Sequence, residues 1–322
     1  MSLLNVRNLS VDYITDDGTA LHAVEDVSFT LEKGRSLGMV GESGCGKTTA
    51  MLGVLRLLPA EGRIVRGDVL FEGTDLFALS ENEMRAYRWK HLSLVFQGAM
   101  NALNPVRRVG DQIAEAIRLH ESGINIKARV RDLLQLVGIT PDMARQYPHQ
   151  YSGGMRQRAM IAMALACSPE VLIADEPTTA LDVMVQAQIL ELLQNLQKEL
   201  GLSIVLVTHD LGVVAEICDD VLVMYGGKVA EYGTVDVIYN NPQHPYTQRL
   251  LQAFPDVDNP AITLTSIAGY PPPLDALPPG CRFEPRCTCA STVCATKSPR
   301  LIQIAPGHFV ACHKLRSTPH GT

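Results

Sequence analysis

The stretch GESGCGKTT, Gly41 to Thr49, decides the fold of this chain. It fits the pattern G-x-x-x-x-G-K-[ST] and lies between an apolar run, Leu37 to Val40, and a helix-permitting stretch, Lys47 to Leu57. Glycines in such a loop let backbone N–H groups turn toward a polyphosphate at the N-terminus of the following helix. The pattern therefore predicts a phosphate-binding loop rather than a glycine-rich turn with a chance lysine. Its predicted nucleotide-binding residues are Gly41, Ser43, Gly44, Cys45, Gly46, Lys47, Thr48 and Thr49.

The side chains of this loop predict ATP and Mg²⁺ as ligands. Lys47 would reach the β and γ phosphates, and the Thr48 hydroxyl would hold a magnesium ion. Cys45 occupies a variable position of the pattern, so we interpret its thiol as chemically inert.

A second segment, Val171 to Pro177, runs from four apolar residues directly into two acids. A buried parallel strand delivers carboxylates to its C-terminal edge in this way. Asp175 is the predicted partner of the magnesium ion. Glu176 is the predicted catalytic residue that polarises the attacking water, because general-base assistance needs a carboxylate that the metal does not occupy.

A third segment, Ile204 to Val207, is apolar and ends in Thr208 and His209. A lone histidine is most often structural. A position at the end of a second strand, after the acid pair, places this imidazole at the same sheet edge and predicts a catalytic role for His209.

The segment YSGGMRQR, Tyr151 to Arg158, lies between the loop and the acid pair and resembles the signature of ATP-binding cassette (ABC) ATPases. The resemblance implies that Ser152, Gly153 and Gly154 open a helix that faces the ATP held by the opposite subunit. A helix N-terminus aimed at a γ phosphate would explain the glycines. The resemblance thus implies a catalytic site completed in trans.

The resemblance assigns three further positions. Gln97 matches the Q-loop, which touches magnesium, the lytic water and the membrane partner. Asp182 matches the D-loop at the dimer interface. Tyr13 stands where an aromatic ring stacks on adenine, with His22 as a weaker candidate. The implied catalytic residues are then Glu176, His209 and Gln97, and the implied magnesium ligands are Thr48, Gln97 and Asp175.

The composition fits a globular protein. The chain has 322 residues, 46% hydrophobic content and a formal net charge of −6, which gives no general attraction to nucleic acid. No apolar stretch approaches ~18 residues, and the opening segment MSLLNVRNLS lacks the features of a secretory signal. The composition therefore predicts a cytosolic protein, and the resemblance to ABC ATPases implies a peripheral position at the cytoplasmic face of the cell membrane, held there by transmembrane partners.

The expected fold is an α/β, ABC-type P-loop NTPase domain with a parallel core sheet, followed by a small cysteine-containing domain. The predicted domains are 1–233 and 234–322. Within the first, the sequence pattern predicts an antiparallel flap up to about residue 32, followed from Gly34 to Gly233 by strands that alternate with helices and form a parallel sheet. Inside that region it predicts a helical subdomain at about 98–168, a helix at Val183 to Leu200 and a hairpin at Val221 to Gly233 turning at Gly226 and Gly227.

The C-terminal part of the chain indicates which group of ABC ATPases the chain resembles. The segment NPQHPYTQRLL, Asn241 to Leu251, resembles the one found in ABC ATPases of dipeptide, oligopeptide and nickel importers. By itself this segment could be no more than a helix entry with proline in the first turn. A proline-rich connector follows at residues 271–279.

Five of the eight cysteines lie in the last 42 residues. The resemblance to dipeptide-permease ATPases implies that Cys281, Cys287, Cys294 and Cys312 bind a 4Fe-4S cluster, with Cys289 outside the pattern. Four thiolates would equally satisfy tetrahedral zinc. Iron–sulfur, zinc and unmetallated thiols all remain open at this point.

These observations predict the ATP-hydrolysing subunit of an importer of di- or oligopeptides. Its implied partners are a second, non-identical ABC ATPase, two transmembrane permease subunits and an external solute-binding protein, with no nucleic acid. Nickel, glutathione or short sugars are the alternative cargoes. The rival classes are a non-transport ABC ATPase acting on nucleic acid or ribosomes, and a redox-sensing ATPase.

Overall fold

The computed structural model describes residues 2–98, 102–253 and 267–315. The chain forms two compact units. The first unit holds residues 32–36 and 78–207, and the second holds residues 2–31, 37–77 and 208–322. Residues 99–101 of the predicted helical subdomain, and residues 254–266 and 316–322 of the predicted C-terminal domain, lie outside the described residues.

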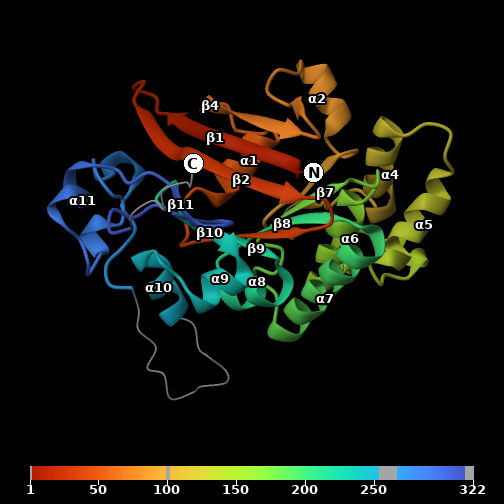
Figure 1. Cartoon of the computed structure of the whole chain (residues 1–322). Coiled ribbons are helices and arrows are strands. Elements are labelled where there is room, and N and C mark those ends of the chain that lie inside the picture. Colours follow the sequence, from red (N-terminus) through yellow and green to blue (C-terminus); the bar gives the residue numbers. More distant parts are fainter. Residues whose placement is uncertain (1, 99–101, 254–266, 316–322) are drawn as a thin grey trace. The chain divides into compact units, whose positions relative to one another are not determined.

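An antiparallel sheet occupies the N-terminal part of the second unit. Its order is β2 (Ala20–Glu32), β1 (Ser2–Ile14), β4 (Gly62–Phe71) and β5 (Thr74–Asp75), and β1, β2 and β4 run side by side in Figure 1. Its register pairs Leu4 with Phe71. The predicted flap is confirmed. Strands β4 and β5 are a correction, because the sequence pattern assigned their residues to the parallel αβ part.

The second unit also contains β3 (Ser36–Val40), β9 (Asp220–Tyr225) and β10 (Lys228–Thr234). Strand β3 pairs with β9 in parallel, whereas β9 and β10 form the predicted hairpin. Gly226 and Gly227 form its turn with φ of 53° and 82°, a conformation that glycine adopts without strain. Two strands of the C-terminal part, β11 (Ile302–Ala305) and β12 (His308–Val310), extend this sheet beyond β10.

The first unit has a parallel sheet of β6 (Leu92–Val95), β7 (Val171–Asp175) and β8 (Ser203–Thr208). Every residue of β7 and β8 is buried, as expected of strands covered on both faces. Around these strands the unit contributes α2 (Glu81–Tyr87), α4 (Val109–His120), α5 (Ile126–Leu136), η1 (Pro141–Arg145), η2 (Pro148–Gln150), α6 (Gly153–Ala164) and α7 (Val183–Leu200).

The predicted helical segment and the predicted long helix are both confirmed. Helices α4 and α5 pack together and bury residues such as Ile113, Ile117 and Leu133, and no strand occurs in the described part between 102 and 150. Helix α7 spans the predicted residues and ends at Gly201, whose φ of 63° suits a glycine after a helix.

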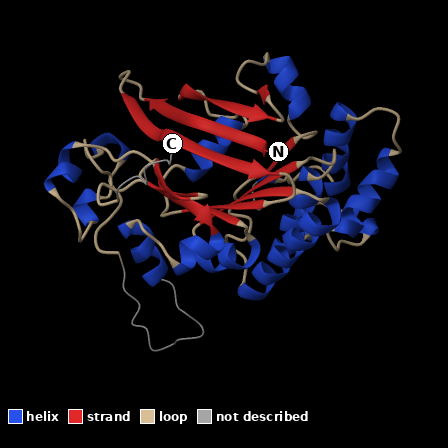
Figure 2. Cartoon of the chain, in the orientation of Figure 1, coloured by secondary structure: helices blue, strands red, loops and turns tan. Residues whose placement is uncertain are grey.

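The remaining helices belong to the second unit: α1 (Lys47–Val54), α8 (Leu211–Ile217), α9 (Val235–Asn240), α10 (Pro245–Gln252), η3 (Leu274–Ala276), η4 (Glu284–Arg286) and α11 (Thr292–Thr296). Figure 2 shows that loops dominate the described chain after residue 267. Parallel and antiparallel pairs together make this a mixed α/β fold. The boundary at residue 233 stays a prediction.

Candidate active site

The predicted phosphate-binding loop follows β3 and leads into α1 in the second unit. Two of its glycines are required by close packing. A Cβ on Gly41 would lie 2.2 Å from the Met224 carbonyl oxygen, and a Cβ on Gly46 would lie 2.7 Å from the Ala23 carbonyl oxygen. Gly46 also has a φ of 97°, which side chains of L-residues rarely tolerate. In this conformation of the loop both positions therefore require glycine.

Lys47 is the first residue of α1, and its side chain folds back into the loop. It is 5% exposed, and Nζ donates to the carbonyl oxygens of Gly41, at 2.7 Å, and Glu42, at 3.2 Å. Thr48 and Thr49 are half-buried in the same helical turn. Burial raises the pKa of the Cys45 thiol, which keeps it neutral, in accord with an inert role.

Tyr13 lies near the end of β1, and the fold brings it to the loop helix. Its hydroxyl is 3.3 Å from the Thr49 hydroxyl oxygen. His22 has its Nδ1 2.8 Å from Asp12 Oδ1 and an exposed ring. Because Tyr13 packs beside the loop, Tyr13 is favoured over His22 as the ring that would stack on adenine.

In the first unit, Gln97 and Glu176 follow the neighbouring parallel strands β6 and β7 and meet at their C-terminal edge. Gln97 Nε2 donates to Glu176 Oε2 at 2.7 Å, and the Thr179 hydroxyl donates to the same oxygen at 2.9 Å. The Glu176 backbone has a positive φ of 45°, and its N–H donates to Val207 O at 2.8 Å. A non-glycine residue in this conformation is held there by its surroundings, as is common at functional sites.

The other residues of this edge take the positions that the sequence pattern predicts. Asp175 is the last residue of β7 and is 3% exposed. His209 directly follows β8, and its side chain is exposed. Thr179 is a site residue that the sequence analysis missed. Its position three residues after Glu176, inside a turn, was the available signal.

The signature residues open α6. The Ser152 side chain caps this helix by accepting the N–H of Met155 at 3.2 Å, and Gly153 is its first residue. A Cβ on Gly154 would approach Val185 Cγ1 to 2.5 Å, so this glycine permits close packing against α7. Asp182 caps α7 by accepting the N–H of Val185 at 3.0 Å. Ser152 and Asp182 are both exposed.

The four predicted cluster cysteines converge in the second unit. Cys281, Cys287, Cys294 and Cys312 line one small pocket, with Cys289 and His244 also at its wall. All five of these cysteines are free thiols. Burial raises the pKa of Cys281 to about 11, and the pKa values of Cys287 and Cys312 are raised for the same reason. Across residues 2–98, 102–253 and 267–315, no group of three or more His, Cys, Asp or Glu side chains is arranged to hold a metal ion.

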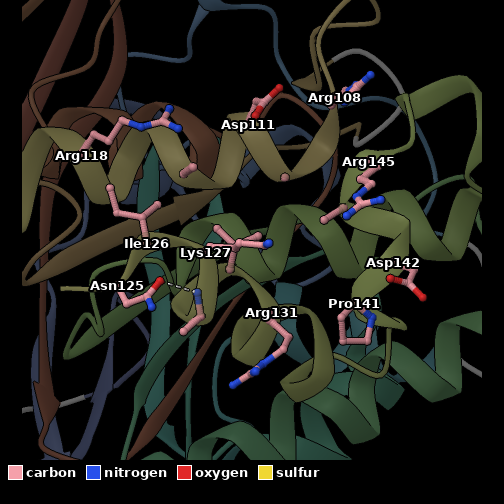
Figure 3. Close-up of a pocket in the computed structure, with 15 residues that line it drawn as sticks. Arg108, Asp111, Arg118, Asn125, Ile126, Lys127, Arg131, Pro141, Asp142 and Arg145 are labelled. Carbon is pink, nitrogen blue, oxygen red and sulfur yellow. Dashed lines mark hydrogen bonds between the residues drawn. The ribbon is translucent and has the colours of Figure 1, made fainter.

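A larger cavity of about 790 Å³ lies between α4, α5 and η1 in the first unit (Figure 3). Its wall carries five cationic side chains and two carboxylates, and all seven residues are exposed. These residues are Arg108, Arg118, Lys127, Arg131 and Arg145, with Asp111 and Asp142. These seven residues belong to no motif that was recognised in the sequence. The signal was a local excess of cations in a chain that is acidic overall.

No helix among the described residues is long and apolar enough to cross a membrane.

Comparison with known proteins identifies the family. Residues 24–179 match the ABC transporter family, and residues 230–294 match the C-terminal region of oligopeptide/dipeptide transporters. The chain is 49% identical to the dipeptide transport ATP-binding protein DppD of Bacillus subtilis, with 96% of this chain and 94% of the relative covered. It is 46% identical to the oligopeptide transport ATP-binding protein OppD of Escherichia coli, with 97% and 93% covered.

A solved structure supports the fold. A dimeric ATP-binding cassette in a post-hydrolysis state, bound to ADP and Pi, aligns with a TM-score of 0.65 at 25% identity and covers 72% of this chain and 98% of its own. The loop and the acid pair were predicted from their own residues, and the helix at the signature from the resemblance to ABC ATPases. The chain therefore belongs to the ABC transporter family, in the group of ATP-binding subunits of dipeptide and oligopeptide importers, and is an ABC-type ATPase.

Proposed function

We propose that this chain hydrolyses ATP in a head-to-tail pair of nucleotide-binding domains and thereby drives uptake of di- or oligopeptides. The observation that carries the proposal is the carboxylate of Glu176, fixed by Gln97 and Thr179 at the edge where β7 ends. A carboxylate held in this way can take a proton from an attacking water without first reorganising.

The roles of the site residues follow from their chemistry. The N–H groups of the loop and the Lys47 ammonium bind the β and γ phosphates, and Tyr13 stacks on the adenine. Glu176 accepts the proton of the lytic water, while Gln97 and His209 orient that water and the γ phosphate. The N-terminus of α6, at Ser152 to Gly154, contacts the γ phosphate of the partner domain, and Asp182 crosses the interface.

Oxygen donors at Thr48, Gln97 and Asp175 suit Mg²⁺, which prefers hard oxygen ligands. These three residues would hold the ion. The bound ion would offset the negative charge of the phosphates. The chain supplies a hydroxyl from the first turn of α1, an amide just after β6 and a carboxylate at the end of β7. A position at or next to the end of a helix or strand limits the motion of each of these side chains.

The membrane partners are two permease subunits and an external solute-binding protein, together with a second, non-identical ATPase. The cation-rich cavity between α4 and α5 offers a surface to an acidic or polar segment of a permease (Figure 3). This assignment places the chain at the cytoplasmic face of the cell membrane. We also propose that the chain is divided into two domains, residues 1–233 and 234–322.

Transport assays test the proposed cargo. A strain whose only copy of this protein carries Lys47→Ala should lose uptake of labelled di- and oligopeptides, because binding of ATP supplies the work of transport. The same strain should retain uptake of free amino acids. Unchanged peptide uptake, with loss of nickel, glutathione or sugar uptake instead, would replace peptides by that alternative cargo. An ATPase rate stimulated by nucleic acid or ribosomes would favour the non-transport class.

We also propose that Cys281, Cys287, Cys294 and Cys312 bind a 4Fe-4S cluster. The convergence of four thiols on one pocket supports the proposal. Four thiolates would also suit zinc, so the two metals are separated by metal analysis. The cluster would supply covalent cross-links to a loop-rich segment that has few core residues.

Anaerobic purification tests the cluster. The wild-type chain should be brown and contain about four irons per chain, as set by the cluster type. Cys281→Ser should lower the iron content and the visible absorbance, whereas Cys289→Ser should leave both unchanged. A colourless, iron-free wild-type protein that folds normally would remove the cluster, and a stoichiometric zinc content would replace it.

A further inference from the structure

Glu42, the second residue of the predicted phosphate-binding loop, is held by a side chain from the C-terminal part of the chain. Arg286 Nη1 donates to Glu42 Oε2 at 2.6 Å, and Arg286 Nη2 donates to Glu42 Oε1 at 3.0 Å. Two parallel hydrogen bonds of this kind fix the orientation of both groups as well as their separation. The loop and a segment 244 residues away in sequence are thus directly connected.

The guanidinium of Arg286 is itself fixed from several sides. Its side chain is 5% exposed. Nε donates to Ala268 O at 2.9 Å, Nη2 to Ile267 O at 3.2 Å, and Nη1 to the Tyr225 hydroxyl at 3.2 Å. Its centre lies 5.7 Å from the centroid of the Tyr225 ring. A cation with this many partners cannot swing away, so it acts as a rigid anchor.

Tyr246 holds the backbone of the same loop residue. Its side chain is fully buried, and its hydroxyl oxygen accepts the N–H of Glu42 at 3.0 Å. The ring packs against Tyr225 and Phe283, with centroids 4.6 Å and 5.4 Å away. Tyr246 belongs to the segment NPQHPYTQRLL, which the sequence analysis could place only as a family marker or a helix entry. The structure gives that segment a contact with the loop.

The same loop residue also contacts Lys47, whose Nζ donates to Glu42 O. Glu42 is therefore held at its N–H, its carbonyl oxygen and its carboxylate. The charge matters as well as the geometry. An unpaired carboxylate within a few ångströms of a bound triphosphate repels it, whereas a carboxylate paired with a guanidinium does not.

We propose that Arg286 and Tyr246 are positioning residues for the phosphate-binding loop. Arg286 neutralises and orients the Glu42 carboxylate, and Tyr246 orients the Glu42 backbone, so that affinity for ATP depends on the C-terminal segment. The inference rests on the proposed role of residues 41–49 in binding ATP. It adds two residues that lie outside every predicted nucleotide motif.

Equilibrium binding of a fluorescent ATP analogue to the full-length chain tests the inference. Arg286→Met should raise the Kd for ATP about 10- to 50-fold, because the Glu42 carboxylate loses its charged partner. At roughly 1.4 kcal/mol per tenfold, this is about 1.4–2.3 kcal/mol of binding free energy. Tyr246→Phe, which removes one hydroxyl, should raise it about 3- to 10-fold. Arg300→Met is the matched control, because Arg300 is an exposed arginine of the same segment, and it should bind ATP as the wild type does.

A second substitution separates positioning from general damage. If Arg286 acts by neutralising Glu42, then Glu42→Gln combined with Arg286→Met should bind ATP at least about fivefold more tightly than Arg286→Met alone, because the repelling carboxylate is gone. Binding of adenosine, which carries no phosphate, should change less than twofold in all these variants. A merely structural role would weaken adenosine and ATP alike and would give no rescue.

The outcomes also distinguish this inference from the assignment of the loop. Arg286→Met with wild-type ATP affinity would overturn the inference, provided that Lys47→Ala weakens ATP binding in the same assay. Lys47→Ala with wild-type affinity would overturn the loop assignment itself. Should Arg286→Met fail to give a folded chain, Arg286→Gln, which also removes the charge, and Tyr246→Phe carry the test, and unchanged ATP affinity in both would equally overturn the inference.

Discussion

Glu176→Gln is expected to bind ATP with wild-type affinity and to lose about 10²- to 10⁴-fold in turnover, the usual contribution of general acid–base assistance. The glutamine is nearly isosteric, and its carbonyl oxygen can still accept hydrogen bonds from Gln97 and Thr179. The substitution therefore removes the base and keeps the local structure. ATP should accumulate in a closed dimer, because binding drives closure and hydrolysis reverses it.

Single-turnover ATPase rates and gel filtration in the presence of ATP measure this effect. Glu191→Gln is the matched control, since Glu191 is an exposed acid of α7 outside the site. It should hydrolyse ATP at the wild-type rate. Hydrolysis by Glu176→Gln at more than a tenth of the wild-type rate would contradict the assignment of Glu176 as the base.

Glu231→Ala is expected to lower the free energy of unfolding by about 3–5 kcal/mol, because it leaves two buried donors and one half-buried donor without their acceptor. Glu231 is 0% exposed. Its carboxyl group accepts the N–H of Gln243 at 2.7 Å and of His244 at 3.0 Å, and its Oε1 lies 2.7 Å from His308 Nε2. This group therefore joins β10, the entry to α10 and β12 in one hydrogen-bonded centre.

Urea unfolding followed by far-UV circular dichroism gives this free energy if the transition is two-state. Glu191→Ala, an exposed glutamate on a helix, should change stability by less than about 0.5 kcal/mol. A loss of less than about 1 kcal/mol in Glu231→Ala would show that water or neighbouring groups satisfy the three donors, and that the centre does not hold the C-terminal strands in place.

The elements around the predicted site were predictable because their signals are local. The glycines of the loop, the apolar strand before Asp175 and Glu176, and the serine that caps α6 each determine backbone conformation within a few residues. The hairpin with Gly226 and Gly227 belongs to the same group, since a turn with positive φ requires residues that tolerate it.

Strands β4 and β5 could not be predicted in this way. They follow α1 in sequence, yet β4 pairs in an antiparallel sheet with β1, from Tyr13 opposite Gly62 to Leu4 opposite Phe71. Alternation within β4 is consistent with a strand in either kind of sheet, and the choice of partner depends on which apolar face is left to cover. The pattern of strands and helices around them favoured the wrong sheet.

Thr179, Arg286 and Tyr246 show the same limit at the level of side chains. The residues next to Arg286 in sequence do not predict its contact with Glu42, because this contact forms only when the C-terminal segment packs beside the loop. In the sequence, Glu231 is likewise an ordinary charged residue of a hairpin strand. Its carboxyl group is buried only because β12 pairs with β10 and the residues before α10 bind to it.

The sequence by itself determined the phosphate-binding loop, the order of the strands and helices that carry the acids, and the resemblance to importer ATPases, because each depends on residues that are neighbours in the chain. Only the tertiary structure decided that Gln97 and Thr179 hold Glu176, and that Arg286 and Tyr246 hold Glu42. Those contacts join segments separated in sequence, and hydrogen bonds between them form only when folding pays the entropy of bringing the segments together.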